Sequence, residues 1–192
     1  MKVINISEGK VNFSQRNNLI NPLSSCNVTS MVMALSYMRF AFPPGEHRQP
    51  EDNLRVFMEA NGKDPTIHAV LSEYTNRWIG RKVTDFSMTR KISDILAELL
   101  AGRPVVISGT FPGFPRKKEK PLGHIVCMVG AVWMGESWIG MPDIVIWDDP
   151  YGNTLQDWRG SGNDIRVDYQ KFIDWIKPVG DSAMKWGHFF YQ

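Results

Sequence analysis

The sequence predicts one α+β domain in which helices come first and strands follow. Between Ser24 and Gly102, apolar residues recur every three or four positions, which is the spacing of helices that bury one face. Beyond Gly102 the chain changes to short runs rich in Val and Ile, separated by Gly, Pro and Lys, as is typical of antiparallel strands. Helices in one half and strands in the other favour the α+β class. The 192 residues are expected to form a single domain, 1–192, with a sizeable core.

Four helices are expected in the first half. The first follows Cys26, and Ser24 or Ser25 can cap its start. Its apolar stripe consists of Val28, Met31, Ala34, Leu35 and Met38. The other three helices are expected around residues 54–58, 67–78 and 92–100. Asn61-Gly62 and Gly102 supply the residues that commonly end a helix.

Five strands and a short helix are expected in the second half. The strands are predicted at residues 104–109, 124–133 and 143–149, with a further strand within 160–169. Residues 169–176 have the spacing of a short helix. The terminal segment 185–192 is expected to close the sheet as an edge strand.

The charge pattern does not indicate a nucleic-acid partner. The formal net charge is only +2, and Lys and Arg are mixed evenly with Asp and Glu. The one dense basic cluster, FPRKKEKP at residues 114–121, is interpreted as a solvated loop between strands. No glycine-rich nucleotide loop and no close Cys or His metal-ligand spacing is present in the sequence, so no cofactor is expected.

The sequence also predicts where the chain is made. The opening residues lack the apolar core of a signal peptide, and no later run reaches the roughly eighteen apolar residues of a membrane span. We therefore expect synthesis in the cytoplasm as a soluble monomer without membrane insertion. With no disulfide framework, Cys26 and Cys127 are expected to be free thiols.

Cys26 is the first candidate for chemistry because it lies at the start of a predicted helix. Unpaired N–H groups and the positive end of the helix dipole favour a thiolate there, which is how a sulfur nucleophile is activated. A small buried thiol fits the same position, so position alone leaves both interpretations open. Cys127 lies inside a predicted strand and is interpreted as a core residue.

A thiolate nucleophile needs a proton shuttle, and the chain has four histidines. His124 opens a predicted strand directly after Gly123, where a rigid backbone would hold its imidazole at the end of the sheet. His47, in a proline-rich segment, and His68, beside the apolar stripe of its helix, are expected at the surface. His188 is the reserve candidate, although its aromatic neighbours are more typical of a packed core or edge residue.

A carboxylate should orient the imidazole, and the next predicted strand ends in Asp148-Asp149-Pro150. Because side chains alternate along a strand, only one of the two aspartates can face His124. Turn formation alone also explains Asp, Pro and Gly at this point.

Four segments together resemble the papain-like cysteine peptidases that process bacteriocins at double-glycine leaders. The segments are SQRNN…NPLSSCNVTSMVMAL, GRPVVISG, GHIVCMVGA and WDDPYGN, which span Ser14 to Asn153. The phage-associated lysin-type branch looks most similar. The resemblance implies a papain-like fold, with the nucleophile at a helix N-terminus packed on a C-terminal antiparallel sheet.

The resemblance also implies a role for each matching residue. Cys26 would be the nucleophile, His124 the general base and acid, and Asp149, which directly precedes the proline, the orienting carboxylate. Gln15 would be the oxyanion donor; a side-chain amide N–H aided by the Cys26 N–H suits that task. Many relatives read Cys-Gly-Pro-Thr-Ser, whereas this chain has Asn27 and Val28 after the cysteine, so the backbone at the start of the helix can differ.

These features favour a peptidase that cuts peptide or amide bonds through an acyl-enzyme. Two other classes stay open: an acyltransferase using the same residues with an amine as acceptor, and a binding module on an inactive scaffold. The lysin resemblance implies peptidoglycan stem peptides or cross-links as substrate, reached after release or delivery to the cell wall. Leader-peptide processing is the alternative. Tryptophans in the second half, including Trp138 and Trp158, pack in the sheet or line a peptide or glycan groove.

Overall fold

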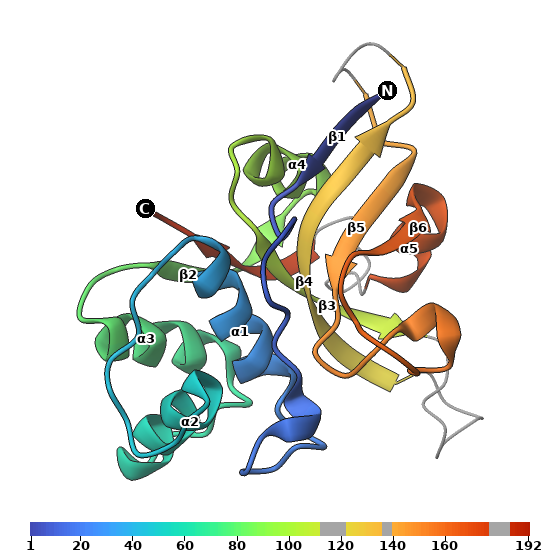
Figure 1. Ribbon diagram of the computed structural model, residues 1–192. Coiled ribbons are helices and arrows are strands. Elements are labelled where there is room, and N and C mark those ends of the chain that lie inside the picture. The colour runs from blue at the N-terminus through green and yellow to red at the C-terminus, as the bar shows by residue number, and fades with distance from the viewer. Residues whose placement is uncertain (112–121, 136–139, 177–184) are drawn as a thin grey trace.

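The structure is a computed structural model that describes residues 1–111, 122–135, 140–176 and 185–192 (Figure 1). Within these ranges a seven-stranded sheet has the order β2-β7-β3-β4-β5-β6, and β1 pairs with β4 beside this path. The strands are β1 (Lys2–Asn5), β2 (Thr84–Arg90), β3 (Val105–Phe111), β4 (Leu122–Trp133), β5 (Ile144–Asp148), β6 (Ile165–Asp168) and β7 (Lys185–Phe190). All of the strand pairs are antiparallel.

Helices lie on both faces of the sheet (Figure 1). α1 (Cys26–Tyr37), α2 (Pro50–Ala60) and α3 (His68–Ile79) form one group with a common core against one face. α4 (Ile92–Leu100) and α5 (Tyr169–Trp175) contribute to a second core on the opposite face. The short 3₁₀ helices are η1 (Gln15–Asn17) and η2 (Thr154–Gln156). Helices grouped on an antiparallel sheet confirm the predicted α+β class.

Side-chain alternation along β4 and β5 divides the residues of these strands between the two cores. Cys127 of β4 and Ile146 of β5 pack with the α1 group, whereas Val126 and Trp147 belong to the second core. This two-residue period of a strand also decides which face each residue near the strand end occupies. His124 lies two residues before Val126, and Asp149 lies two residues after Trp147, so both fall on the face of the second core.

The first helix is more deeply buried than its sequence predicts. Every residue of α1 from Asn27 to Leu35 is buried, including the polar Thr29 and Ser30. The apolar stripe predicts a helix with one solvated face, but β4 packs on one side of α1 while α2 covers another. Ser25 occupies the N-cap position without making a side-chain cap hydrogen bond, so the predicted capping by this serine is wrong.

The strand predictions are correct at four places and incomplete at three. β3, β4, β5 and β6 lie where the Val- and Ile-rich runs place them. β7 lies between β2 and β3, so the prediction of an edge strand is wrong; β2 is at the edge instead. β1 and β2 were not predicted, because β1 has only four residues and five of the seven residues of β2 are polar. The basic segment 114–121 and Trp138 lie outside the described residues.

Both cysteines are free, as predicted. No helix in the described ranges is both long enough and apolar enough to cross a bilayer.

Candidate active site

Cys26 opens onto a cleft of about 300 Å³ between the helical group and the sheet. Its walls include Thr66 and His68 from the helical side and His124 and Tyr151 from the sheet side. Cys26 is the first residue of α1, and its side chain is half-buried. A cysteine at this place lies beside the N–H groups of the first helical turn, which lack intrahelical partners.

His124 lies at the start of β4 and is held by Asp149, which directly follows β5. The imidazole Nε2 is 2.8 Å from Asp149 Oδ1, and both side chains are buried. Phe111 and Trp158 pack edge-on against the ring, with centroids 5.9 and 5.0 Å away. These aromatic rings shield the His124–Asp149 pair from water. Because Nε2 faces Asp149, Nδ1 is the imidazole nitrogen available to Cys26.

The environment favours a protonated imidazole at His124. Burial lowers the pKa of His124, but the negative charge and hydrogen bond of Asp149 oppose this and, together with the Cys26 sulfur, raise that pKa to about 10. An imidazolium beside the sulfur stabilises a thiolate electrostatically. A positively charged imidazole beside the sulfur is the kind of partner that activates a cysteine nucleophile.

Asp149 is fixed by more than the imidazole. Its Oδ1 also accepts a hydrogen bond from the Tyr151 backbone N–H at 2.7 Å, and its Oδ2 lies 3.4 Å from the Thr154 hydroxyl. These donors hold the carboxylate in one orientation. Asp149 therefore both forms the turn that begins before Pro150 and holds His124, so the two expectations for this segment apply to the same residue.

Gln15 lies in the same cleft and is nearly fully buried, with 1% of its surface exposed. Its Nε2 donates to the Pro22 carbonyl at 2.8 Å, and its backbone N–H donates to the Pro150 carbonyl at 2.8 Å. An amide nitrogen has two hydrogens, so one remains after the Pro22 bond. With the Cys26 N–H, this amide can supply two donors to a developing oxyanion.

Comparisons with known proteins identify the family and the fold of the chain. A sequence model of the Peptidase_C39 like family matches residues 10–176. The chain belongs to this family. A protein from Bacillus anthracis whose crystal structure is described as that of a C39-like peptidase is 16% identical, with a TM-score of 0.59 over 100% of this chain and 98% of that chain. No curated protein matches the chain significantly. The predicted fold and the predicted class of enzyme, a cysteine peptidase, are confirmed.

In the present chain, Asp148 points away from His124. Asp148 points to the α1 face, where its oxygens accept hydrogen bonds from the Tyr37 hydroxyl and the Asp164 backbone N–H, both at 2.6 Å. Burial raises the pKa of Asp148 to about 6 despite these donors. Cys127 lies opposite Asp148 on β4 and is fully buried, and burial raises the pKa of its thiol. Both residues therefore belong to the core of the peptidase.

The other histidines differ in their surroundings. His188, the reserve candidate, is fully buried and contacts Ser72 and His68, and it is absent from the cleft lining. His47 does not line the cleft, and its backbone is bonded to the side chain of Asn53. His68 lines the cleft and is part-buried, so its predicted position at the surface is wrong. The partial burial arises because β2 and β7 pack against the first turn of α3.

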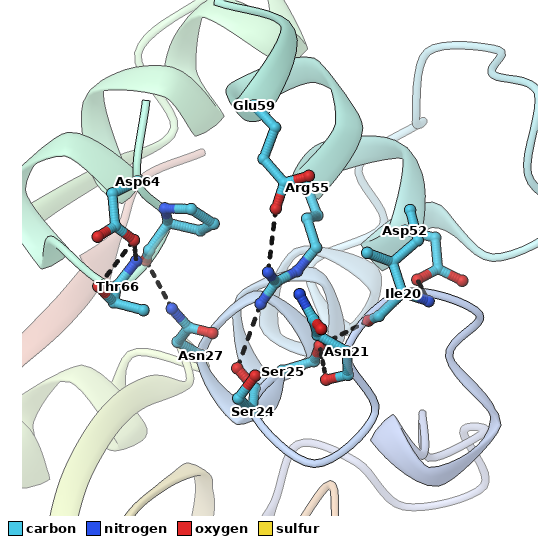
Figure 2. A network of polar contacts seen from close by, with 11 residues as sticks. Ile20, Asn21, Ser24, Ser25, Asn27, Asp52, Arg55, Glu59, Asp64 and Thr66 are labelled. Carbon is cyan, nitrogen blue, oxygen red and sulfur yellow. Dashed lines mark hydrogen bonds and ion pairs between the residues drawn. The ribbon is translucent and has the colours of Figure 1, made fainter. Parts of the chain in front are cut away.

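A network of polar contacts holds the loop that precedes Cys26 (Figure 2). The buried Arg55 of α2 donates to the Ser24 carbonyl at 3.2 Å, and Asp52 accepts the Ile20 N–H at 3.2 Å. Ser25 Oγ is 2.7 Å from the Asn21 carbonyl, which accounts for its failure to cap α1. α2 therefore fixes the backbone beside the nucleophile.

A second set of contacts joins α1 to the sheet. The Ser30 hydroxyl donates to the Ile125 carbonyl at 3.2 Å, directly after His124. Asn27, the residue after Cys26, donates through its side chain to the Pro65 carbonyl. Tyr151, Trp158 and Thr154 support His124 and Asp149. Sequence reasoning named Trp158 only as a packing or groove residue and did not assign this role to any of the three. The only signal was their position shortly after the Asp-Pro turn.

Proposed function

We propose that this cysteine peptidase cuts peptide bonds with Cys26 as nucleophile, His124 as general acid and base, Asp149 as orienting carboxylate and Gln15 as oxyanion donor. The observation that carries the proposal is the 2.8 Å contact of His124 Nε2 with Asp149 in the cleft that also contains Cys26. The nucleophile, the shuttle and the orienter come from α1, β4 and the end of β5, which meet only in the folded chain.

The chemistry follows from this arrangement. The Cys26 thiolate attacks the carbonyl carbon of the scissile bond, and the oxygen becomes an anion near the Gln15 amide and the Cys26 N–H. His124 gives its proton to the leaving nitrogen as the C–N bond breaks, which leaves an acyl-enzyme. Water then attacks the acyl carbon while His124 removes its proton. Loss of the carboxylic acid restores the thiolate and the imidazolium.

We place the substrate among the peptides of the bacterial cell wall, as stem peptides or cross-links. The support is the order of the four sequence segments that resemble the lysin-type branch, from Ser14 to Asn153. Among the described residues that line the cleft there is no Asp, Glu, Lys or Arg. A cleft of this kind binds peptide backbone without requiring a charged side chain. Such an enzyme acts on the wall after release or delivery.

Digestion of purified peptidoglycan tests this proposal. Wild type is expected to release new amino termini without new reducing ends, and Cys26→Ala is expected to release neither. New reducing ends would instead show cleavage of glycan. If intact wall is untouched and a peptide with a double-glycine leader site is cut, leader processing replaces the wall as the function. Transfer of the acyl group to added amine in preference to water would make the enzyme an acyltransferase.

A further inference from the structure

His68 belongs to the cleft but not to the groups that perform the chemistry above. It is the first residue of α3, and its side chain lines the same cleft as Cys26 and His124. Its imidazole packs against Trp186 and Phe86, with ring centroids 4.4 and 5.6 Å away. These contacts from β7 and β2 fix the plane of the ring.

A chain of hydrogen bonds runs from His68 into the interior. His68 Nδ1 lies 3.2 Å from His188 Nε2, and His188 Nδ1 lies 2.7 Å from the Ser72 hydroxyl. His188 is fully buried and Ser72 is 4% exposed, so water does not satisfy either group. Within the described contacts, Ser72 Oγ has His188 as its one side-chain or backbone partner.

Counting donors fixes the direction of this chain. A buried hydroxyl needs an acceptor for its hydrogen, and His188 Nδ1 is the acceptor within reach of Ser72. His188 then carries its own hydrogen on Nε2 and donates it to His68 Nδ1. His68 must therefore hold its hydrogen on Nε2. The opposite direction would leave the buried Ser72 hydrogen without an acceptor, which is unfavourable.

The surroundings of both imidazoles favour the uncharged form. Burial lowers the pKa of His68, and burial together with the neighbouring His68 lowers that of His188. His68 Nδ1 is turned toward His188, and the aromatic side chains of Trp186 and Phe86 pack against the ring. The edge that carries Nε2–H is therefore the one available to a ligand in the cleft.

We propose that His68 is a specificity-determining residue whose Nε2–H donates a hydrogen bond to a neutral carbonyl oxygen of the substrate. The inference rests on the proposed function in that it takes the cleft to be the substrate site. Ser72 and His188 are positioning residues, because they fix the hydrogen of His68 on the nitrogen that faces the ligand. A carboxylate of the substrate is disfavoured at this place. Its negative charge would be buried without a partner unless His68 became protonated.

The first test reads the tautomers by long-range ¹H–¹⁵N NMR of the full chain at neutral pH. Single variants of each histidine assign the signals. We expect Nε2 to be protonated and Nδ1 unprotonated in both His68 and His188. In Ser72→Ala, His188 should lose this fixed tautomer. Unfolding experiments on the same variant check that it keeps its fold. A hydrogen on His68 Nδ1 in wild type would overturn the proposal.

The second test reads binding without turnover. N-acetylglycinamide, a neutral diamide, is added to Cys26→Ala while the His68 ring signals are followed; we expect a saturable shift that acetate does not cause. His68→Phe keeps an aromatic ring without the donor, and in this variant the ring signals of His124, which lines the same cleft, are followed instead. Its affinity for the diamide should fall at least about fivefold, roughly the loss of one hydrogen bond. His47→Phe is the matched control, and its affinity should stay at the wild-type level.

Each outcome of the binding test decides the proposal. No saturable shift with the diamide overturns it even if the peptidase cuts peptidoglycan. A shift with acetate alone overturns the preference for a neutral carbonyl. A diamide shift in a protein that cleaves neither wall nor leader peptides supports the subsite while the proposed function fails.

Discussion

The two adjacent aspartates show how one residue's face decides its role. Asp149 follows Trp147 by two residues and reaches His124, while Asp148 points toward Tyr37 on the other face. The order of the carboxylates in the sequence therefore matters less than the alternation of the strand that ends at them. Asp149 acts on a titrating imidazole, whereas Asp148 is a buried acceptor for two donors.

Replacing Asp149 separates its charge from its geometry. Asp149→Asn keeps an acceptor for His124 Nε2 but removes the negative charge that raises the pKa of His124. A lower pKa means that the imidazolium is lost at lower pH, so the alkaline limb of the kcat/KM profile should move to lower pH. Asp149→Ala also removes the orienting contact, and its turnover should fall about a hundredfold or more.

The pH profile of peptide hydrolysis checks this prediction. Asp148→Asn is the matched control, because it changes the neighbouring carboxylate without touching the imidazole. An alkaline limb that moves in Asp148→Asn and stays in Asp149→Asn would assign the orienting role to Asp148.

Asp148 should itself make stability depend on pH. Its pKa is about 6 in the folded chain, above that of an aspartate in an unfolded chain, so the folded state binds more protons between about pH 4 and 6. Stability from this group is therefore present below about pH 4 and is lost as the pH rises through 6. Urea unfolding across this window should show a smaller decline in Asp148→Asn. An equal decline in both proteins would show that Asp148 does not titrate there.

The two thiols should separate activity from stability. Cys26→Ala removes the nucleophile at a half-buried position, so hydrolysis should fall to background while the urea midpoint stays close to wild type. Cys127→Ala leaves a small void in the core and should cost about 1 kcal/mol of unfolding free energy with activity retained. Equal turnover in wild type and Cys26→Ala would remove the proposed mechanism.

At the scale of elements, α2 acts on the site through the loop that precedes the nucleophile. Arg55→Met keeps the aliphatic stem but removes the donor to the Ser24 carbonyl, so the loop beside the oxyanion donors should loosen. We expect kcat/KM to fall about tenfold, since small displacements of catalytic groups have large effects on rate. Glu59→Gln breaks only the half-exposed pair with Arg55 and should change kcat/KM less than twofold. Similar losses in both variants would argue against the loop as the cause.

The elements also show what the sequence could predict. α1 to α5 and β3 to β6 follow from apolar spacing, because each has a face that must be buried. The inner position of β7 could not be predicted, since a strand's neighbours depend on contacts distant in sequence, such as Val106 with His188. The same limit applies to the site: position and family resemblance indicated Cys26, His124, Asp149 and Gln15, which the structure brings into one region. The supporting Trp158 and Thr154, and the chain from Ser72 to His68, depend on tertiary packing.

At the scale of the whole molecule, the sheet joins two cores into one structure. β4 supplies Cys127 and Val129 to the helical core and Val126 and Met128 to the other core. Because the two cores share this strand, loss of either core would remove the packing that holds the strand in place for the other. We therefore predict that the chain unfolds in one cooperative transition, in keeping with a single domain. The cleft lies at the junction of the two halves, and its geometry depends on both.

Two cavity variants test this cooperativity. Leu35→Ala enlarges the helical core and Leu99→Ala the opposite core; both leucines are fully buried, and each change should cost about 2–5 kcal/mol. In each variant, far-ultraviolet circular dichroism and tryptophan fluorescence should report the same lowered midpoint, because both cores unfold together. Trp78 lies in the helical core while Trp147 and Trp158 lie in the other, so fluorescence senses both. Two transitions, with Leu35→Ala shifting one and Leu99→Ala the other, would show that the halves unfold independently.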